Sequence, residues 1–198
     1  MTLPVFAARL LVLGLASTVV QAQTLKAPLE KPSPAGDRIA VYQVFLARYS
    51  HGARGVVNLA NRTTPLDLSD HNSDGCMAGI VLQDLPSSRS TTQPLGPEVL
   101  TGMKIKLVDP AQQPSVVQRN DPSVTIRRGE AVANAVDSAF ASGLLQLSEI
   151  AFDQTRHYAV LSFSFSCGML CGNGGTLVFQ KIGSRWKATN RRCSSWVS

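Results

Sequence analysis

Four cysteines carry the chemistry that this sequence indicates most directly. Cys167 and Cys171 are separated by three residues, whereas Cys76 and Cys193 each stand alone. Four thiolates can bind zinc, but zinc ribbons usually draw them from two close pairs. A short pair can also be redox-active, yet here it precedes an expected strand and lacks the helix N-terminus that lowers a thiol pKa in redox folds. Three states are therefore open to these residues: disulfides, a zinc site or free thiols.

The N-terminus favours disulfides, because it has the pattern of a secretory signal peptide. A short basic start at residues 1–9 precedes the apolar run 10–20, and small residues precede an expected cleavage site after Ala22. As a helix the apolar run reaches about 16 Å, half of a roughly 30 Å hydrocarbon core, so a membrane anchor is not expected. No later stretch is apolar for long enough to span a membrane. We predict a secreted or periplasmic protein, in a compartment where disulfides persist.

Local geometry selects one of the three disulfide connectivities that four cysteines allow. Cys167 and Cys171 flank a glycine-containing hairpin tip, so they can approach the roughly 5.5 Å Cα separation that a bridge requires. This pairing leaves Cys76 to bridge with Cys193. We therefore predict two disulfides, Cys167–Cys171 and Cys76–Cys193.

Other arrangements of reactive side chains are weak. Residues 70–75 begin like a calcium loop, but Val81 stands where the bidentate glutamate is required. The chain contains no G-x-S-x-G, G-x4-G-K-[ST] or H-E-x2-H motif. None of the histidines has a metal-ligand spacing; they are His51, His71 and His157. We predict no metal and no cofactor, and the sequence assigns no catalytic residue.

Basic residues gather at the C-terminal end of the chain. Residues 154–198 contain six Lys and Arg residues and no acidic residue. In a strand Arg185, Lys187 and Arg191 would share one face, which could bind an anionic envelope polymer; nucleic acid is not an expected partner in vivo. The alternative is a solvated sheet face or edge, because Lys and Arg commonly protect edge strands.

Hydrophobic spacing predicts the upstream elements. A Pro-containing lead-in at residues 23–36 is expected to be flexible, and Asp37 is placed to cap the first helix. The expected elements that follow are helix 38–50, strand 55–60, strand 103–108 and helix 130–142. Two stretches with three prolines each, 86–97 and 109–122, are typical of loops.

The C-terminal third predicts an antiparallel meander. Residues 144–152 indicate a strand, and residues 158–166 alternate with period two. A Gly-rich loop over 167–175 leads to a strand at 176–181, and Gly183-Ser184 suits a hairpin turn before a strand at 185–190. Such a sheet needs a cover, so we predict an α+β domain over residues 37–198, with one or two amphipathic helices on the meander.

The run Ser164–Gly175, the Gly183–Lys187 hairpin and the final Trp196-Val197-Ser198 resemble an uncharacterised family of secreted bacterial proteins. Members of that family end in S-x-C-G-x-L-C-G-x-G-G, a G-x-W hairpin and a terminal W-[IV]-S. The resemblance covers residues 144–198 closely and the upstream part loosely. It implies a bacterial exported protein, and it carries no known activity, cofactor or catalytic residue.

Composition narrows the class of protein but does not by itself assign a function. Hydrophobic residues at 44% and charged residues at 16% exclude an intrinsically disordered chain. We expect a non-enzymatic, exported binding or envelope-associated domain with a basic C-terminal sheet. The alternative is a small secreted hydrolase with a pocket between helix and sheet, in which His157 or a carboxylate would act as base.

Overall fold

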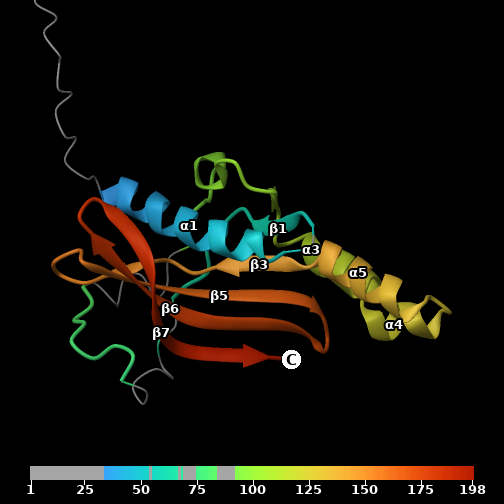
Figure 1. The fold of residues 1–198 in the computed structure, drawn as a ribbon. Helices are drawn as coiled ribbons and strands as arrows, with labels where there is room; N and C mark the ends of the chain where they lie inside the picture. Colours follow the sequence, from blue (N-terminus) through green and yellow to red (C-terminus); the bar gives the residue numbers. More distant parts are fainter. Residues whose placement is uncertain (1–33, 54, 67, 69–74, 84–91) are drawn as a thin grey trace, which may run out of the picture. The chain divides into compact units, whose positions relative to one another are not determined.

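The computed structural model describes residues 34–53, 55–66, 68, 75–83 and 92–198. The predicted signal peptide, most of the lead-in, His71 and most of the calcium-like loop lie outside these residues. The helices, in chain order, are α1 (Pro34–His51), the 3₁₀ helix η1 (Pro97–Leu100), α3 (Gln113–Arg119), α4 (Pro122–Arg127) and α5 (Val132–Ser142). The strands are β1 (Val57–Ala60), β2 (Ile105–Val108), β3 (Leu144–Leu147), β4 (Ala151–Phe152), β5 (Tyr158–Gly168), β6 (Cys171–Ile182) and β7 (Arg185–Val197). The predicted α+β class is confirmed (Figure 1).

One mixed sheet organises the fold. Its strand order is β2-β1-β3-β5-β6-β7, and β4 pairs with β5 beside this path. β1 is parallel to both β2 and β3, whereas β3, β5, β6 and β7 form the predicted antiparallel meander. The expected strand at 144–152 is divided into β3 and β4, because the Glu149 amide donates to the Thr64 carbonyl instead of to β5.

The Gly-rich segment is strand rather than loop. β6 begins at Cys171, so Gly172, Gly174 and Gly175 pair with β5. β7 continues to Val197 instead of ending at residue 190, because two register shifts let it follow β6 to its far end. Glycine composition predicted a loop here, but pairing on both sides keeps the segment extended.

The N-terminal helix is longer than predicted. It begins at Pro34, three residues before Asp37, so the last residues of the predicted lead-in are helical. Proline is favoured in the first turn because its missing N–H has no intrahelical acceptor there. Asp37 therefore lies inside the first turn and is not the capping residue.

The predicted loop at 109–122 contains helix α3 and the start of α4. Pro114 and Pro122 both stand in a first turn, where proline is compatible with a helix. Asp121 caps α4, and its side chain accepts from the Ser123 amide. The prolines of this stretch therefore mark the first turns of two helices, and the predicted loop was wrong here.

Helix α5 forms as predicted, and its small residues are the buried ones. Val132 and Phe140 are more than half exposed. Ala135 and Ala139 are fully buried. α5 packs against α3, α4, β1 and β5, and small side chains allow this close approach.

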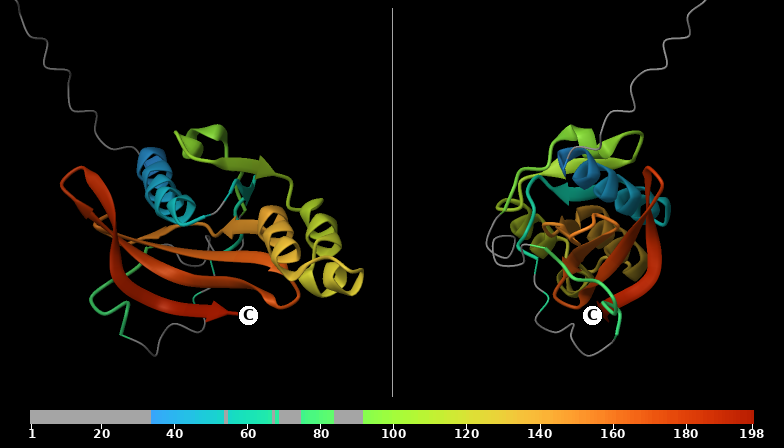
Figure 2. Two further views of the ribbon diagram at one scale, coloured as in Figure 1. Left: turned by 45° about the vertical axis from the view of Figure 1, so that its right-hand side comes forward. Right: turned by 90° about the vertical axis from the view of Figure 1, so that its left-hand side faces the viewer.

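Apolar clusters cover both faces of the long strands. On one face α1 contributes Val41, Tyr42, Phe45 and Leu46, which pack on Leu145, Leu161 and Phe179. On the other face Val160 and Val178 pack with Leu66, Leu68 and the Cys76–Cys193 bridge. Figure 2 shows β5, β6 and β7 bending past α1. The C-terminal half of α1 lines a groove with these strands.

Candidate functional site

A groove of about 1260 Å³ lies between α1, α5 and the sheet. Its helical walls come from the C-terminal half of α1 and from α5, and its floor comes from β5, β6 and β7. Its lining combines aromatic, small and uncharged polar residues with two charged ones. The lining residues include Phe45, Arg48, Tyr49, Val136, Asp137, Phe140, Phe163, Phe165, Asn173, Gly175, Thr189, Asn190, Ser194 and Ser195.

Five aromatic rings form a continuous apolar lining. The centroids of Phe45 and Phe163 are 5.0 Å apart, and Tyr49 lies 5.6 Å from Phe45 and 6.3 Å from Phe165. Phe140 stacks on Phe165 with a centroid distance of 5.9 Å and extends the lining onto α5. Rings at these distances pack favourably with one another. Tyr49, Phe140 and Phe163 are accessible to a ligand, whereas Phe45 and Phe165 are buried beside them.

Two glycines make room for this lining. Gly175 pairs with Phe163 across β5 and β6, so the floor of the groove has no side chain at that position. A Cβ added at Gly143 would lie 2.6 Å from Cε2 of Phe165. The absence of a side chain at Gly143 therefore allows the Phe165 ring to occupy its place in the groove.

The groove has polar residues on its strands and one charged residue on each of its two helices. β6 and β7 supply uncharged donors and acceptors, including Asn173, Ser194 and Ser195. Arg48 and Asp137 are the charged residues of the lining. Burial raises the pKa of Tyr49 to about 12, so its phenol stays protonated at neutral pH and can donate a hydrogen bond.

His157 lies away from the groove. It stands in the turn before β5, and its Nδ1 is 3.2 Å from Oγ1 of Thr155. The groove uses Phe163 and Phe165 of β5, and six residues of strand separate His157 from Phe163 by about 20 Å. The structure thus does not bring this predicted base to the pocket between helix and sheet.

The buried carboxylates of the corner between β3 and β5 serve the fold. Glu149 accepts from the Thr63 hydroxyl and from Nη2 of Arg38, 3.1 Å away. Asp153 accepts from the Tyr158 amide at 2.6 Å and from Thr155, so it closes the turn before β5. Neither carboxylate lines the groove.

Asp37 has a role that its local sequence does not indicate. Its Oδ1 accepts from Nζ of Lys181 at 2.6 Å and from Nε1 of Trp186 at 2.9 Å, and Arg156 lies 3.7 Å from Oδ2. Burial raises the pKa of the Asp37 carboxyl, but the two hydrogen bonds and the charges of Lys181 and Arg156 outweigh it and hold this pKa below its usual value. This cluster joins the first turn of α1 to the β6–β7 hairpin.

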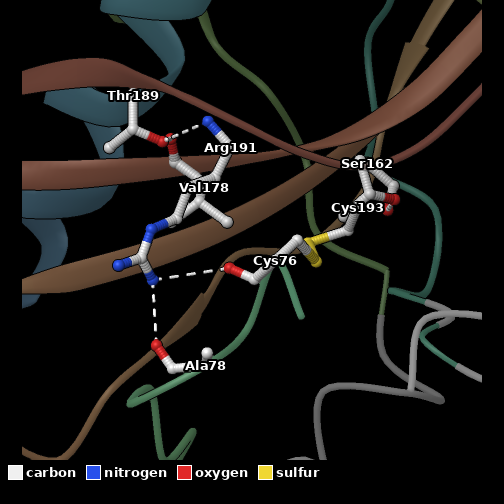
Figure 3. The surroundings of a disulfide bond; sticks show 8 residues. Cys76, Ala78, Ser162, Val178, Thr189, Arg191 and Cys193 are labelled. Carbon is white, nitrogen blue, oxygen red and sulfur yellow. Dashed lines mark hydrogen bonds between the residues drawn. A yellow bond between two sulfur atoms is a disulfide. The ribbon is translucent and has the colours of Figure 1, made fainter. Parts of the chain in front are cut away.

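The predicted basic face is divided. Arg185 and Lys187 are exposed and flank the buried Trp186, as strand alternation predicted. Arg191 follows a register shift, and its guanidinium donates to the carbonyls of Cys76 and Ala78 at 3.4 and 3.0 Å (Figure 3). Arg191 therefore holds a loop onto the sheet, and Arg185 and Lys187 form what is left of the predicted anion-binding face.

All four cysteines are paired as the sequence predicted. The Cα–Cα distance is 5.2 Å in the Cys76–Cys193 bridge and 5.0 Å in the Cys167–Cys171 bridge. These bridges fit an oxidising compartment. Among the described residues no cluster of His, Cys, Asp and Glu is arranged to hold a metal ion.

Comparisons with known proteins add no relative. No family model matches the chain, and neither the curated proteins nor the solved structures contain a significant match. Within the described part of the chain, no helix has the length and apolar character needed to cross a membrane.

Proposed function

We propose that this chain is an exported binding protein whose groove between α1, α5 and the sheet holds an apolar small molecule with a polar end. The cluster of five aromatic rings at the groove, three of them accessible, is the observation that carries this proposal. Such a lining removes apolar ligand surface from water, at roughly 25 cal/mol for each Å² buried. Ligand pockets commonly combine a mostly apolar lining with a few polar groups that orient the ligand.

The polar groups of the groove support the second half of this proposal. Asn173, Ser194 and Ser195 supply hydrogen-bonding side chains on the strand side. Arg48, exposed on α1, supplies a positive charge. A ligand with its apolar body on the rings and a polar or anionic end on these groups would leave few polar atoms buried without a partner.

The hydrolase hypothesis has less support. It expected His157 or a carboxylate as base; His157 lies elsewhere, and Asp137 is the carboxylate that lines the groove. The hydroxyls of Ser194 and Ser195 have no histidine beside them in the groove lining. The chemistry of these residues therefore favours binding over hydrolysis.

Envelope association through the basic sheet stays a separate prediction. Arg185 and Lys187 would carry it without Arg191, whose guanidinium is held by two carbonyl groups. Two exposed cations give a weaker and less localised positive potential than three. Export of the protein, which both functions require, is supported by the two disulfides.

A fluorescent apolar probe tests the groove. Binding of N-phenyl-1-naphthylamine is titrated against the native protein and against Ala141→Trp, which places an indole on the α5 wall. We expect about tenfold weaker binding, which corresponds to roughly 1.4 kcal/mol of lost contact. Ala133→Trp is the matched control, because Ala133 is an exposed residue of the same helix outside the groove lining. Equal probe affinity in both variants would contradict the proposal.

A further inference from the structure

Two exposed apolar side chains stand at the tip of the β5–β6 hairpin. Met169 and Leu170 are 86% and 85% exposed, and they lie between the bridged Cys167 and Cys171. Val197, also 86% exposed, and Trp196, 46% exposed, lie at the adjacent end of β7. We call Met169, Leu170, Trp196 and Val197 the apolar tip.

The fold holds the hairpin in place from two sides. The Cys167–Cys171 bridge closes the loop, and Oδ2 of Asp121 accepts from the Met169 amide at 2.6 Å. A Cβ at Gly168 would lie 2.8 Å from the same carboxylate oxygen, so glycine permits this approach. Met169 and Leu170 are thus presented to solvent by a fixed backbone and do not fold back onto the core.

The end of β7 is fixed beside the hairpin. Gly172 and Ser198 exchange N–H···O bonds of 3.2 and 3.0 Å. A Cβ at Gly174 would lie 2.7 Å from Cζ2 of Trp196, and one at Gly172 would lie 3.3 Å from Cζ3. The indole therefore lies across both glycines on one face of the sheet, while Val197, the next residue of β7, points to the other face.

Three exposed arginines lie close in sequence to Asp121, whose side chain contacts the hairpin. Arg119, Arg127 and Arg128 all lie within seven residues of it. The side chain of Arg127 folds back along α4, where its Nε donates to the Ser123 carbonyl at 2.7 Å. Asp121 is buried, and the segment from Arg119 to Glu130 otherwise carries three exposed arginines and one partly exposed acid, Glu130. The α4 side of the tip is therefore net positive.

We propose that the apolar tip inserts into the surface of an anionic lipid bilayer while these arginines contact lipid phosphates. Apolar side chains beside exposed cations are the pattern of interfacial membrane binding, and tryptophan favours the boundary between headgroups and acyl chains. A protein partner is the less favoured occupant, since a protruding hairpin end offers only a fraction of the roughly 800 Å² that each partner contributes to a standard interface. The proposal does not depend on a ligand in the groove.

Sedimentation with lipid vesicles tests the insertion. The full mature chain is mixed with vesicles of phosphatidylglycerol and phosphatidylethanolamine, and separately with phosphatidylcholine vesicles. We expect binding to the anionic vesicles only, weaker at high salt, with a blue shift and reduced acrylamide quenching of Trp196. Trp186 is 5% exposed, so it contributes a nearly constant background.

Matched variants locate the binding surface. Met169→Ser/Leu170→Ser should weaken vesicle binding about tenfold or more, because each side chain would otherwise leave water. Ile182→Ser is the control, since Ile182 is an exposed apolar residue at the other end of β6. Arg127→Gln/Arg128→Gln should cost about fivefold per arginine, whereas Arg185→Gln/Lys187→Gln at the opposite hairpin should cost little.

Two results would overturn the proposal. The first is no sedimentation with anionic vesicles at low salt, which would leave a protein as the occupant of the tip. The second is equal binding by Met169→Ser/Leu170→Ser and Ile182→Ser. Circular dichroism of each variant checks folding, and all of the substituted side chains are exposed.

Discussion

The two disulfides should contribute very unequally to stability. They are removed separately, as Cys76→Ala/Cys193→Ala and as Cys167→Ala/Cys171→Ala. The first bridge joins residues 117 apart in sequence, and the second joins residues 4 apart. A bridge destabilises the unfolded chain by restricting it, and a longer closed loop is restricted more.

Loop length sets the expected magnitudes. In the chain-entropy treatment the bridge Cys76–Cys193 contributes about 5 kcal/mol and the bridge Cys167–Cys171 about 2 kcal/mol. The long bridge also packs with Val160 and Val178 on one face of the sheet, so its loss frees the loop that covers this cluster. Since domains are stable by about 5–15 kcal/mol, the first variant should be near its unfolding limit while the second stays folded.

Urea unfolding followed by circular dichroism measures this difference. The native protein, each variant and the reduced native protein are compared at pH 7. We expect a much lower midpoint for Cys76→Ala/Cys193→Ala than for Cys167→Ala/Cys171→Ala, and a midpoint for the reduced protein at or below that of the first variant. Equal midpoints for the two variants, or a larger loss from the short bridge, would refute the loop-length argument.

Two further predictions concern Asp37 and Gly143. Because the folded pKa of Asp37 is lowered, its contribution to stability is present above the unfolded value of about 3.9 and is lost as pH falls through the folded pKa. Asp37→Asn should therefore lower the free energy of unfolding at pH 7. In this variant the free energy of unfolding should also decrease less between pH 7 and pH 3 than in the native protein, and urea titrations at both pH values measure this. Gly143→Ala should destabilise by about 1–3 kcal/mol and change probe affinity in the groove, because the new Cβ overlaps the Phe165 ring; unchanged thermal unfolding would contradict this.

Local patterns explain what could be predicted. The alternation along residues 158–166 predicted β5, and Gly183 predicted the β6–β7 turn, because both signals arise within a few residues. The short disulfide could also be predicted, because Cys167 and Cys171 are close in sequence. Only two other cysteines remain, so this pairing also predicted the Cys76–Cys193 bridge. These features required no knowledge of how distant segments pack.

Contacts between distant segments explain what was missed. Asp37 and Lys181 are separated by 144 positions, and nothing in either local sequence indicates that they meet. The groove draws its rings from α1, α5 and β5, which hydrophobic spacing places on their own faces but not together. Arg191 shares this problem, since the register shift and the bridged loop that engage it follow from tertiary pairing.

The Gly-rich start of β6, which was predicted to be a loop, contributes to both the groove and the apolar tip. As a strand, it runs along the floor of the groove and beside the end of β7. Asn173, Gly174 and Gly175 line the groove, and Gly172 and Gly174 also lie against the indole of Trp196. Asn173 also pairs with Val197 of the apolar tip. One short stretch of strand therefore joins the groove to the tip, and a bulky residue in it would disturb either the ring-lined floor or the seat of Trp196.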